Sequence, residues 1–330
     1  MQNIRIPGRG AFAVRAYRSS DMPFVLELWN MAFGKEMSAL LWQWKYHDNP
    51  LGFRILLCVN ASDEPVVMYG GIPYRANWCG KTVEIIQLTD IMSHPGYRKT
   101  GLFVETGRVF FERFAGPDRC VFVYGFPGKY HFDIGRKHLD YREMSPGVVY
   151  LHAAISGMTS HLPEPDGCMT LVSPDDPALD DLWESVKNSY PLAIQRNAAF
   201  AGWRYGKHPL NRYELWAHRQ ECRDALTACV ALKVDTDKAV MVDWTLPDSR
   251  DIFGSVLANL SKNLAERGVK YLETWLPDGH YVCRHAVSCG FEKRPEPTGI
   301  IPAARLLCST LPFETINENL YYTMADGDLF

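Results

Sequence analysis

The sequence lacks any strong excess of charge and any long apolar run. It has 35 Lys and Arg against 38 Asp and Glu, and its formal net charge is −3. No run of basic residues is available to neutralise phosphates, so we do not expect bulk nucleic-acid binding. No stretch approaches the roughly 18 apolar residues of a membrane span. The first twelve residues have no apolar core segment, so they do not form a signal peptide.

The nine cysteines give no sign of a disulfide framework or a metal site. Their number is odd, they are scattered, and no CxxC pair is followed by a second one at metal-site spacing. Several lie in apolar runs typical of buried strands, as Cys58 does. We interpret them as reduced, mostly buried thiols of a cytoplasmic protein without a bound metal, and a catalytic cysteine is the alternative.

What is present is the composition of a globular protein, with 47% hydrophobic and 22% charged residues. A chain of 330 residues exceeds a typical single domain. Residues 156–167 contain two prolines, two glycines and several polar residues, which is typical of a linker. We therefore expect a first domain over residues 1–155 and a second over residues 168–330.

Hydrophobic periodicity and turn residues predict an α/β fold in both parts. In the first part, we expect strands near residues 11–17, 54–60, 66–77, 83–94, 120–125 and 141–154, with helices between them. In the second part, we expect strands near residues 168–172, 213, 226, 240, 271–275 and 291, and helices at 176–189, 196–207, 249–267 and 280–288. The order of elements is the same in both parts.

Tryptophan and proline recur at fixed spacing, which indicates an internal duplication. Trp44-Lys45-Tyr46-x-x-Asn49-Pro50-Leu51 matches Trp203-Arg204-Tyr205-x-x-His208-Pro209-Leu210 at an offset of 203 − 44 = 159. Coincidence between two ordinary α/β domains is the alternative, but it requires tryptophan and proline to agree by chance. We favour the duplication.

The segment from Asp90 to Phe103 carries the chemistry. A strand ends, a short loop turns, and a helix begins with Arg98, Lys99 and Gly101 at its entrance. A helix N-terminus offers unpaired N–H groups and a partial positive charge, and glycine lets the backbone approach an anion closely. This pattern predicts a pyrophosphate site, and a solvated loop with a chance basic pair is the alternative.

Here the sequence resembles the GNAT superfamily of N-acetyltransferases, whose pyrophosphate loop runs [RQ]-x-x-G-x-[GA]. Arg98-Lys99-Thr100-Gly101-Leu102-Phe103 matches the first two anchor positions, whereas Phe103 replaces the small last residue. The resemblance covers the whole first half and, more weakly, the second. It implies two tandem GNAT-like domains, each a mixed, mostly antiparallel sheet flanked by helices. It also implies acetyl-CoA or another acyl-CoA as co-substrate.

The resemblance places residues as well. It implies Ile91, Met92 and Ser93 as pantetheine contacts on the fourth strand, and residues 98–103 as the pyrophosphate loop. Many family members place a glutamate base on that strand and an acid tyrosine in the fourth helix. This sequence has Gln87 and Arg136 near those positions.

With the usual pair missing, Asp90 is the first candidate base, and capping of the loop that follows is its alternative role. His94 is a second candidate, because histidine is a common general base, although fixing the loop is the alternative for it too. Tyr124, with Tyr130 and His131, is a candidate for protonating the leaving thiolate.

The second half lacks a comparable pyrophosphate site. Asp248 and Asp251 stand at the start of the corresponding helix, where they repel a pyrophosphate, and Ser249 is typical of a plain N-cap. We expect this half to bind no CoA and to brace the first half. The aromatic segment 320–324 is expected to form a core strand, with a pocket lining as the alternative.

These features predict an acetyl-CoA-dependent N-acyltransferase that acts on a small amine by direct attack on the thioester. One alternative is another donor, such as a longer acyl-CoA, acyl carrier protein or aminoacyl-tRNA. Another is a CoA-binding or sensing module without activity. We expect no membrane partner and a monomer or homodimer.

Overall fold

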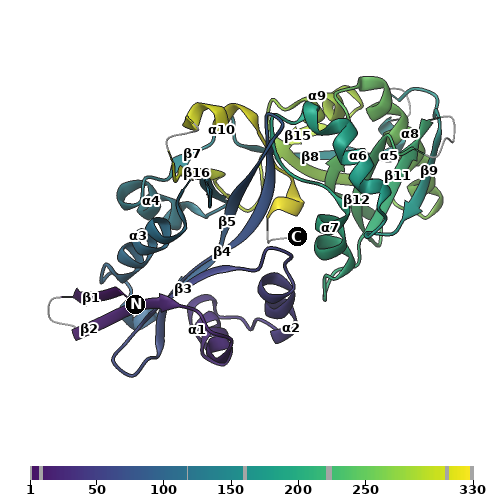
Figure 1. Ribbon diagram of the computed structural model, residues 1–330. Coiled ribbons are helices and arrows are strands. Elements are labelled where there is room, and N and C mark those ends of the chain that lie inside the picture. The colour runs from purple at the N-terminus through teal and green to yellow at the C-terminus, as the bar shows by residue number, and fades with distance from the viewer. Residues whose placement is uncertain are drawn as a thin grey trace. The chain divides into compact units, whose positions relative to one another are not determined.

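The computed structural model describes residues 2–6, 10–116, 118–158, 162–220, 225–308 and 312–327. The chain forms two compact units, and each is assembled from several segments (Figure 1). Unit 1 comprises residues 1–74, 83–143 and 302–313, and unit 2 comprises residues 75–82, 144–301 and 314–330. This division describes compactness alone. The expected domain bounds of 1–155 and 168–330 therefore stay a prediction.

Unit 1 is built on a mixed sheet in the order β1-β2-β3-β4-β5-β6-β16-β7. Neighbouring strands are antiparallel wherever their pairing is described, except β5 and β6, which are parallel. The strands are β1 (Gln2–Ile6), β2 (Gly10–Ala16), β3 (Arg54–Val59), β4 (Pro65–Trp78), β5 (Lys81–Ser93), β6 (Phe122–Gly125), β7 (Arg142–Glu143) and β16 (Ala303–Leu306).

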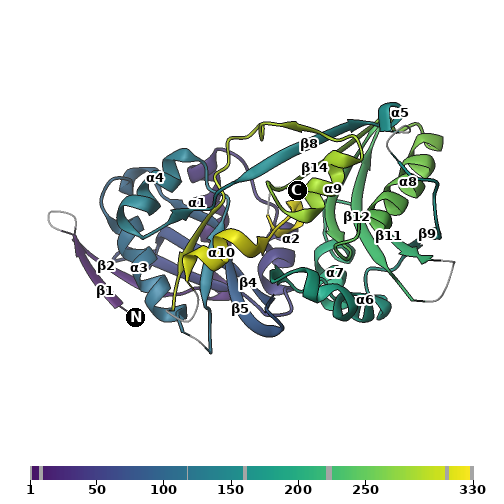
Figure 2. The same ribbon diagram turned by 90° about the horizontal axis from the view of Figure 1, so that it is seen from above.

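Helices cover both faces of this sheet. They are η1 (Ser19–Asp21), α1 (Met22–Phe33), α2 (Ala39–Trp42), the π-helix η2 (Gln43–His47), η3 (Pro95–Tyr97), α3 (Leu102–Phe114) and α4 (Lys129–His138). A Cβ at Gly70 would meet the Tyr46 hydroxyl of η2, whereas one at Gly71 would meet Phe110 of α3. Because successive strand residues point to opposite faces, η2 and α3 lie on opposite sides of β4. Figures 1 and 2 show α3 and α4 next to each other.

Unit 2 contains a second mixed sheet in the order β15-β8-β14-β13-β12-β11-β9. Only the β13–β14 pair is parallel among the described pairings. Its strands are β8 (Val148–Ala154), β9 (Cys168–Val172), β11 (Glu214–Arg219), β12 (Ala228–Asp235), β13 (Lys238–Thr245), β14 (Tyr271–Pro277) and β15 (Glu292–Arg294). The short strands β10 (Leu192–Ile194) and β17 (Leu320–Tyr321) pair with each other, and β10 also pairs with the end of β4.

The helices of unit 2 repeat the order seen in unit 1. They are α5 (Ile155–Met158), α6 (Ala178–Val186), η4 (Lys187–Ser189), α7 (Ala198–Ala201), the π-helix η5 (Gly202–Gly206), α8 (Arg250–Glu266), α9 (Tyr281–Ser288) and η7 (Met324–Asp326), and α10 (Phe313–Asn319) begins at the last residue of a unit 1 segment. Ser249 caps α8 as expected, because its Oγ accepts a hydrogen bond from the Ile252 N–H. No described helix combines the length and the apolar character needed to cross a bilayer.

The expected α/β fold class and the order of elements are confirmed, with one difference of topology. The strand expected over residues 141–154 is two strands, β7 in unit 1 and β8 in unit 2. The break falls at Ser145-Pro146-Gly147, because proline has no N–H for a ladder hydrogen bond. In the sheet of unit 1, β16 lies between β6 and β7, although it follows β15 in the sequence. Each sheet therefore takes one strand from the sequence half that mainly builds the other sheet.

The repeated tryptophan motif forms the same contact in both units. Both copies lie in a π-helix. The Tyr46 hydroxyl donates to the Asp90 carboxylate at 2.6 Å, and the Tyr205 hydroxyl donates to Asp243 at 2.7 Å. Each aspartate lies near the end of the strand that precedes a long helix of its unit, β5 before α3 and β13 before α8. The shared contact is strong support for the duplication.

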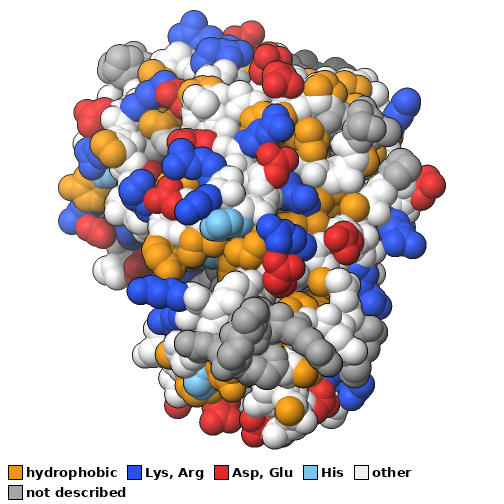
Figure 3. All heavy atoms as spheres, turned by 90° about the vertical axis from the view of Figure 1, so that its left-hand side faces the viewer, with side chains coloured by type: hydrophobic (Ala, Val, Ile, Leu, Met, Phe, Trp, Pro, Cys, Tyr) orange, Lys and Arg blue, Asp and Glu red, His pale blue; other side chains and the backbone are white. Residues whose placement is uncertain are grey.

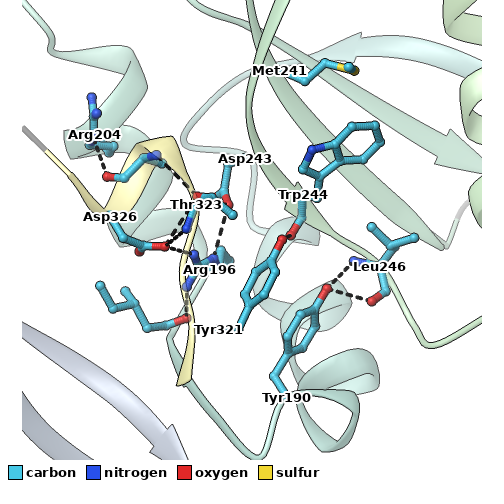
Figure 4. A network of polar contacts seen from close by, with 12 residues as sticks. Tyr190, Arg196, Arg204, Met241, Asp243, Trp244, Leu246, Tyr321, Thr323 and Asp326 are labelled. Atoms are coloured by element: carbon cyan, nitrogen blue, oxygen red, sulfur yellow. Dashed lines mark hydrogen bonds and ion pairs between the residues drawn. The ribbon is translucent and has the colours of Figure 1, made fainter. Parts of the chain in front are cut away.

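The cation beside each aspartate differs between the units. Lys45 Nζ lies 2.8 Å from Asp90 Oδ2, and both side chains are buried. In unit 2, Arg196 lies 3.4 Å from Asp243 and also pairs with Asp326, whose pKa burial raises to about 6 (Figure 4). Arg204, the counterpart of Lys45, donates instead to the Ala325 carbonyl at 2.9 Å. The network in unit 2 thereby holds the C-terminal segment.

Replacing Lys45 by methionine leaves the Asp90 carboxylate buried without its cation. Removing one member of a buried pair costs about 3–5 kcal/mol. We expect that decrease in the free energy of unfolding, measured by urea denaturation. The control is Lys129→Met, since Lys129 is exposed and pairs with Asp133 at 3.4 Å, so its loss costs less than about 1 kcal/mol. Equal stability of the two variants contradicts a structural role for the buried pair.

Candidate active site

Unit 1 contains a cavity of about 700 Å³ beyond the end of β5. Four elements bound it: the C-terminal end of α1, the end of β5 with the loop that follows, the start of α3 and the start of α4. The lining residues are Ala32, Phe33, Ile91, Met92, Ser93, Tyr97, Arg98, Lys99, Thr100, Gly101, Phe103, Gly128, Lys129, Tyr130, His131 and Ile134.

The cavity begins where β5 and β6 part. The two parallel strands pair at Ile86 with Val123 and at Gln87 with Tyr124. Three residues later Asp90 has a φ of 53°, a left-handed conformation that aspartate adopts more readily than most residues. Beyond it, residues 91–93 line the cavity as the resemblance implied. The described pairing of β5 with β6 ends at Gln87, and a strand edge that parts from its neighbour can present backbone groups to a ligand.

The loop before α3 has the shape of an anion cradle. Gly101 has a φ of 89° and directly precedes α3, and Lys99 has a φ of 62°. A Cβ added to Gly101 would meet no atom within 4 Å, so the space in front of it is open. The first N–H groups of a helix have no backbone partner within the helix and favour an anion at its N-terminus. In α3 the Leu102 N–H donates to Thr100 Oγ1 at 3.4 Å. This geometry fits a pyrophosphate.

The side chains of the loop between β5 and α3 make contacts within the loop and with the end of α1. Thr100 donates to the Tyr97 carbonyl at 2.7 Å, which closes the turn. Arg98 donates to the Ala32 carbonyl at 3.0 Å, so its guanidinium also ties the loop to the end of α1. Lys99 is exposed. Leu102 is fully buried and does not line the cavity, so of the predicted contacts it alone lies beneath the site.

The structure weighs against Asp90 as the general base. Its side chain is buried, accepts hydrogen bonds from Lys45 and Tyr46, and is not part of the lining. A carboxylate held by an ammonium and a hydroxyl is stabilised in its charged form and is a poor proton acceptor. Its contacts and its left-handed backbone give Asp90 a structural role.

The other two catalytic candidates also lie outside the lining. Tyr124 is fully buried, with its ring 5.9 Å from that of Phe126. His94 caps η3, since its Nδ1 accepts from the Gly96 N–H at 3.1 Å. The loop-fixing role of His94 is therefore the one that its contacts support.

His131 is the histidine among the described residues that line the cavity. It lies on the first turn of α4, and its ring is 5.1 Å from Phe103 and 6.2 Å from Tyr141. Burial lowers the pKa of His131 to about 4. Among the described residues that line the cavity, none is an aspartate or a glutamate.

Ala32 and Phe33 were missed by sequence reasoning, because an apolar helix end is typical of a core contact. The charged side chains among the described lining residues are all positive, and they are those of Arg98, Lys99 and Lys129. Figure 3 shows basic side chains close to hydrophobic ones on the side of the molecule at the left of Figure 1. The described residues contain no group of three His, Cys, Asp or Glu that could hold a metal ion.

The corresponding strand end in unit 2 is closed by tyrosines. When Asp243 is aligned with Asp90 in the sequence, Trp244 corresponds to Ile91 and Leu246 corresponds to Ser93. The Tyr321 hydroxyl donates to the Trp244 carbonyl at 3.0 Å, and Tyr190 exchanges hydrogen bonds of 2.7 and 2.9 Å with Leu246 (Figure 4).

A third hydroxyl completes this closure. Tyr281 donates to the Leu246 carbonyl at 2.8 Å. At the helix entrance, the Asp248 carboxylate lies 2.9 Å from His285. Backbone groups of Trp244 and Leu246, the counterparts of Ile91 and Ser93, are thus paired with tyrosine hydroxyls in unit 2.

Comparison with known proteins agrees with the geometry of unit 1. Residues 13–133 match the family model of the acetyltransferase (GNAT) domain. None of the curated proteins matches the sequence.

Solved structures resemble the chain over most of its length. A crystal structure from Enterococcus faecalis, described as a conserved protein of unknown function and probable N-acyltransferase, matches with a TM-score of 0.70 at 12% identity, over 90% of this chain and 73% of that one. A GCN5-related N-acetyltransferase from Anabaena variabilis matches with a TM-score of 0.67 at 10% identity, over the same shares.

A tandem GNAT protein from the clavulanic acid biosynthesis pathway matches with a TM-score of 0.54 at 14% identity, over 91% of this chain and 100% of that one. Likeness at such identities shows the fold alone, and the family match adds the domain. The chain has the fold of tandem GNAT proteins, and its residues 13–133 match the model of the acetyltransferase (GNAT) domain.

Proposed function

We propose that the protein is an N-acyltransferase that transfers an acetyl group from acetyl-CoA to a small amine in the cavity of unit 1. The observation that carries the proposal is one continuous cavity. It joins the open strand end at residues 91–93 to the helix entrance at Gly101. An extended chain that ends in a pyrophosphate matches both features, because one offers backbone hydrogen bonds and the other an anion site.

The residues of the cavity divide the binding between them. The N–H groups at the start of α3 hold the pyrophosphate, and Arg98 and Lys99 add positive charge. The backbone of Ile91 and Ser93 pairs with pantetheine, as the tyrosine hydroxyls pair with Trp244 and Leu246 in unit 2. The thioester then lies toward the parting of β5 and β6.

The reaction is an acyl transfer by direct attack. The lone pair of a neutral amine forms a bond to the thioester carbon, the C–S bond breaks, and CoA leaves as a thiolate that takes up a proton. No carboxylate in the described lining receives the amine proton. The amine therefore binds in its neutral form, and the excess proton passes to water, because the lowered pKa of His131, about 4, makes its imidazole a weak proton acceptor.

Replacing Gly101 by alanine places a methyl group in the cradle. We expect the Kd of acetyl-CoA to rise at least tenfold, because a Cβ blocks the approach of the phosphates and the φ of 89° strains alanine. Calorimetry measures the Kd directly. In a thermal shift assay, acetyl-CoA at a hundred times its Kd stabilises the wild type by about 2.7 kcal/mol, or about 5–10 °C.

Gly268→Ala is the matched control, since Gly268 has a φ of 85° and open space around it but lies after α8. Both substitutions carry the same backbone strain, and only the first touches the cradle. Equal Kd values for the two variants place CoA elsewhere. An unchanged melting temperature of the wild type with acetyl-CoA and with longer acyl-CoAs rejects the proposed function.

We expect one acetyl-CoA to bind per chain. The strand end of unit 2 is occupied by Tyr190, Tyr281 and Tyr321, and Asp248 stands at the helix entrance. The stoichiometry from calorimetry checks this expectation. Two sites per chain, or one site that survives Gly101→Ala at full affinity, contradicts it.

His131 makes the stability of the protein depend on pH. Its folded pKa of about 4 lies below the ordinary value of 6.5, so between these values the unfolded chain binds more protons than the folded one. Its contribution is complete above pH 6.5 and is lost as the pH falls toward 4. We expect His131→Gln to lose less stability than the wild type between pH 6.5 and 4.5 in urea denaturation. Parallel curves mean that His131 titrates normally.

A further inference from the structure

Unit 2 contains a cavity of its own, of about 450 Å³, at the start of α9. Its lining residues lie within four segments of this unit, 144–147, 189–191, 277–284 and 317–322. We call it the α9 cavity. Sites for small molecules have volumes of about 300–1,000 Å³, so the α9 cavity is large enough to hold one.

The α9 cavity resembles the cavity of unit 1 on one side only. Pro277 corresponds to Pro127 at an offset of 277 − 127 = 150, so the start of α9 corresponds to the start of α4. At that offset His280 takes the place of Tyr130, and each residue lines the cavity of its own unit. The described lining of the α9 cavity includes neither the end of β13 nor the start of α8. The parts that the proposed function assigns to CoA have no counterpart in this lining, which indicates a different ligand.

His280 offers a hydrogen-bond donor to the α9 cavity. As the N-cap of α9, its Nδ1 accepts from the Val282 N–H at 3.3 Å. Burial and the positive charge of Arg284 and Arg196 lower the pKa of His280 to about 3, so the ring is neutral at pH 7. A neutral imidazole that accepts at Nδ1 carries its proton on Nε2. Among the described residues, only Val282 forms a hydrogen bond with the His280 side chain, so the Nε2 proton is available to a ligand.

Positive charge accompanies this donor. Arg284 also lines the α9 cavity, and its guanidinium donates to the Gly279 carbonyl just before the helix. The N-terminus of α9 adds a partial positive charge. A carboxylate can accept hydrogen bonds from a guanidinium and an imidazole N–H at the same time, and such bonds are strong because of the charge.

Negative charge in the lining comes mainly from another helix. Glu318 of α10 lines the α9 cavity, is exposed, and forms no ion pair with a described residue. The second carboxylate of the described lining, Asp278, is already paired with Lys293. A ligand with negative charge alone would be repelled by Glu318, whereas an ammonium group would be attracted to it.

Apolar side chains make up another part of the lining. Pro146, Pro191 and Leu320 contact the α9 cavity. Their side chains offer no hydrogen-bond partner, and burying an unpaired hydroxyl costs free energy. They therefore favour a ligand with an apolar body over a polyol such as a sugar.

We propose that the α9 cavity of unit 2 binds a small zwitterion, namely an α-amino acid with an apolar side chain. Its carboxylate accepts from His280 and Arg284, its ammonium group pairs with Glu318, and its side chain lies on the apolar part of the lining. This site goes beyond the proposed function, because it requires neither CoA nor the cavity of unit 1.

Calorimetry on the full chain tests the ligand class with three probes. They are L-leucine, 4-methylpentanoate, which lacks the ammonium group, and 3-methylbutylamine, which lacks the carboxylate. We expect L-leucine to bind at one site per chain, about fivefold or more tightly than either analogue, because each analogue lacks one charged partner of the site. No binding of L-leucine at millimolar concentrations, or equal affinity for either analogue, overturns the proposal.

Two variants test whether the ligand lies in the α9 cavity. We expect Glu318→Gln to weaken the binding of L-leucine about fivefold and to leave that of 4-methylpentanoate unchanged, because only L-leucine carries an ammonium group. We expect His280→Asn to weaken the binding of both by about fivefold or more, because asparagine also caps a helix but lacks the imidazole N–H.

Glu314→Gln is the matched control, since Glu314 lies on α10 like Glu318, is also exposed and is not part of the lining. Its affinity for L-leucine is expected to equal that of the wild type. Melting temperatures of the variants verify that they are folded. Glu318→Gln is a change at an exposed position, so wild-type affinity for L-leucine in this variant is sufficient to overturn the proposal.

The cavity of unit 1 is the competing site for L-leucine, because its proposed acceptor is also an amine. L-leucine that binds only together with acetyl-CoA, with the same affinity in Glu318→Gln, is an acceptor in unit 1, and this result overturns the proposal. A chain that binds no acetyl-CoA but binds L-leucine in a manner that depends on Glu318 rejects the proposed function alone and supports the site in unit 2.

Discussion

The site depends on one buried aspartate. Asp90 takes up a left-handed conformation within β5, and Lys45 and Tyr46 hold its carboxylate. The residues after it lead into the cavity and no longer follow β6. A solvated aspartate would gain little from this backbone geometry, but the buried ion pair and the hydroxyl fix it. The packing of η2 on one face of the sheet thus determines the position of a strand end that a ligand can use.

Unit 2 has the same contact between an aspartate and a tyrosine, but side chains fill the strand end beside it. Asp243 accepts from Tyr205 as Asp90 does from Tyr46, so the strand end is held in a comparable way. Three tyrosine hydroxyls then satisfy the backbone of Trp244 and Leu246. A strand end buried without partners would cost free energy, and in unit 2 these hydroxyls remove that cost. The tyrosines do for unit 2 what pantetheine is proposed to do for unit 1.

Local signals predicted the parts of this protein that local physics determines. The cap at Ser249, the helix that begins after Gly101 and the repeated tryptophan motif all follow from neighbouring residues. The exchange of β8 and β16 could not be predicted, because an alternating strand fits either sheet equally well. The pairing of Asp90 with Lys45 could not be predicted, because the two residues lie 45 positions apart in the sequence. The apolar character of Phe33 likewise does not distinguish a cavity mouth from a core contact.

The missing carboxylate in the cavity has a consequence for how such a site would accelerate a reaction. Without a charged base in the described lining, little of the rate can come from proton transfer by a fixed side chain. Holding an amine against a thioester is by itself worth several orders of magnitude, provided that both are oriented. In the proposed site, the cradle at Gly101 and the strand end that follows Asp90 would provide that orientation for the donor. The positive charge of Arg98, Lys99 and Lys129 also disfavours a protonated amine, so the cavity selects the neutral form that can attack.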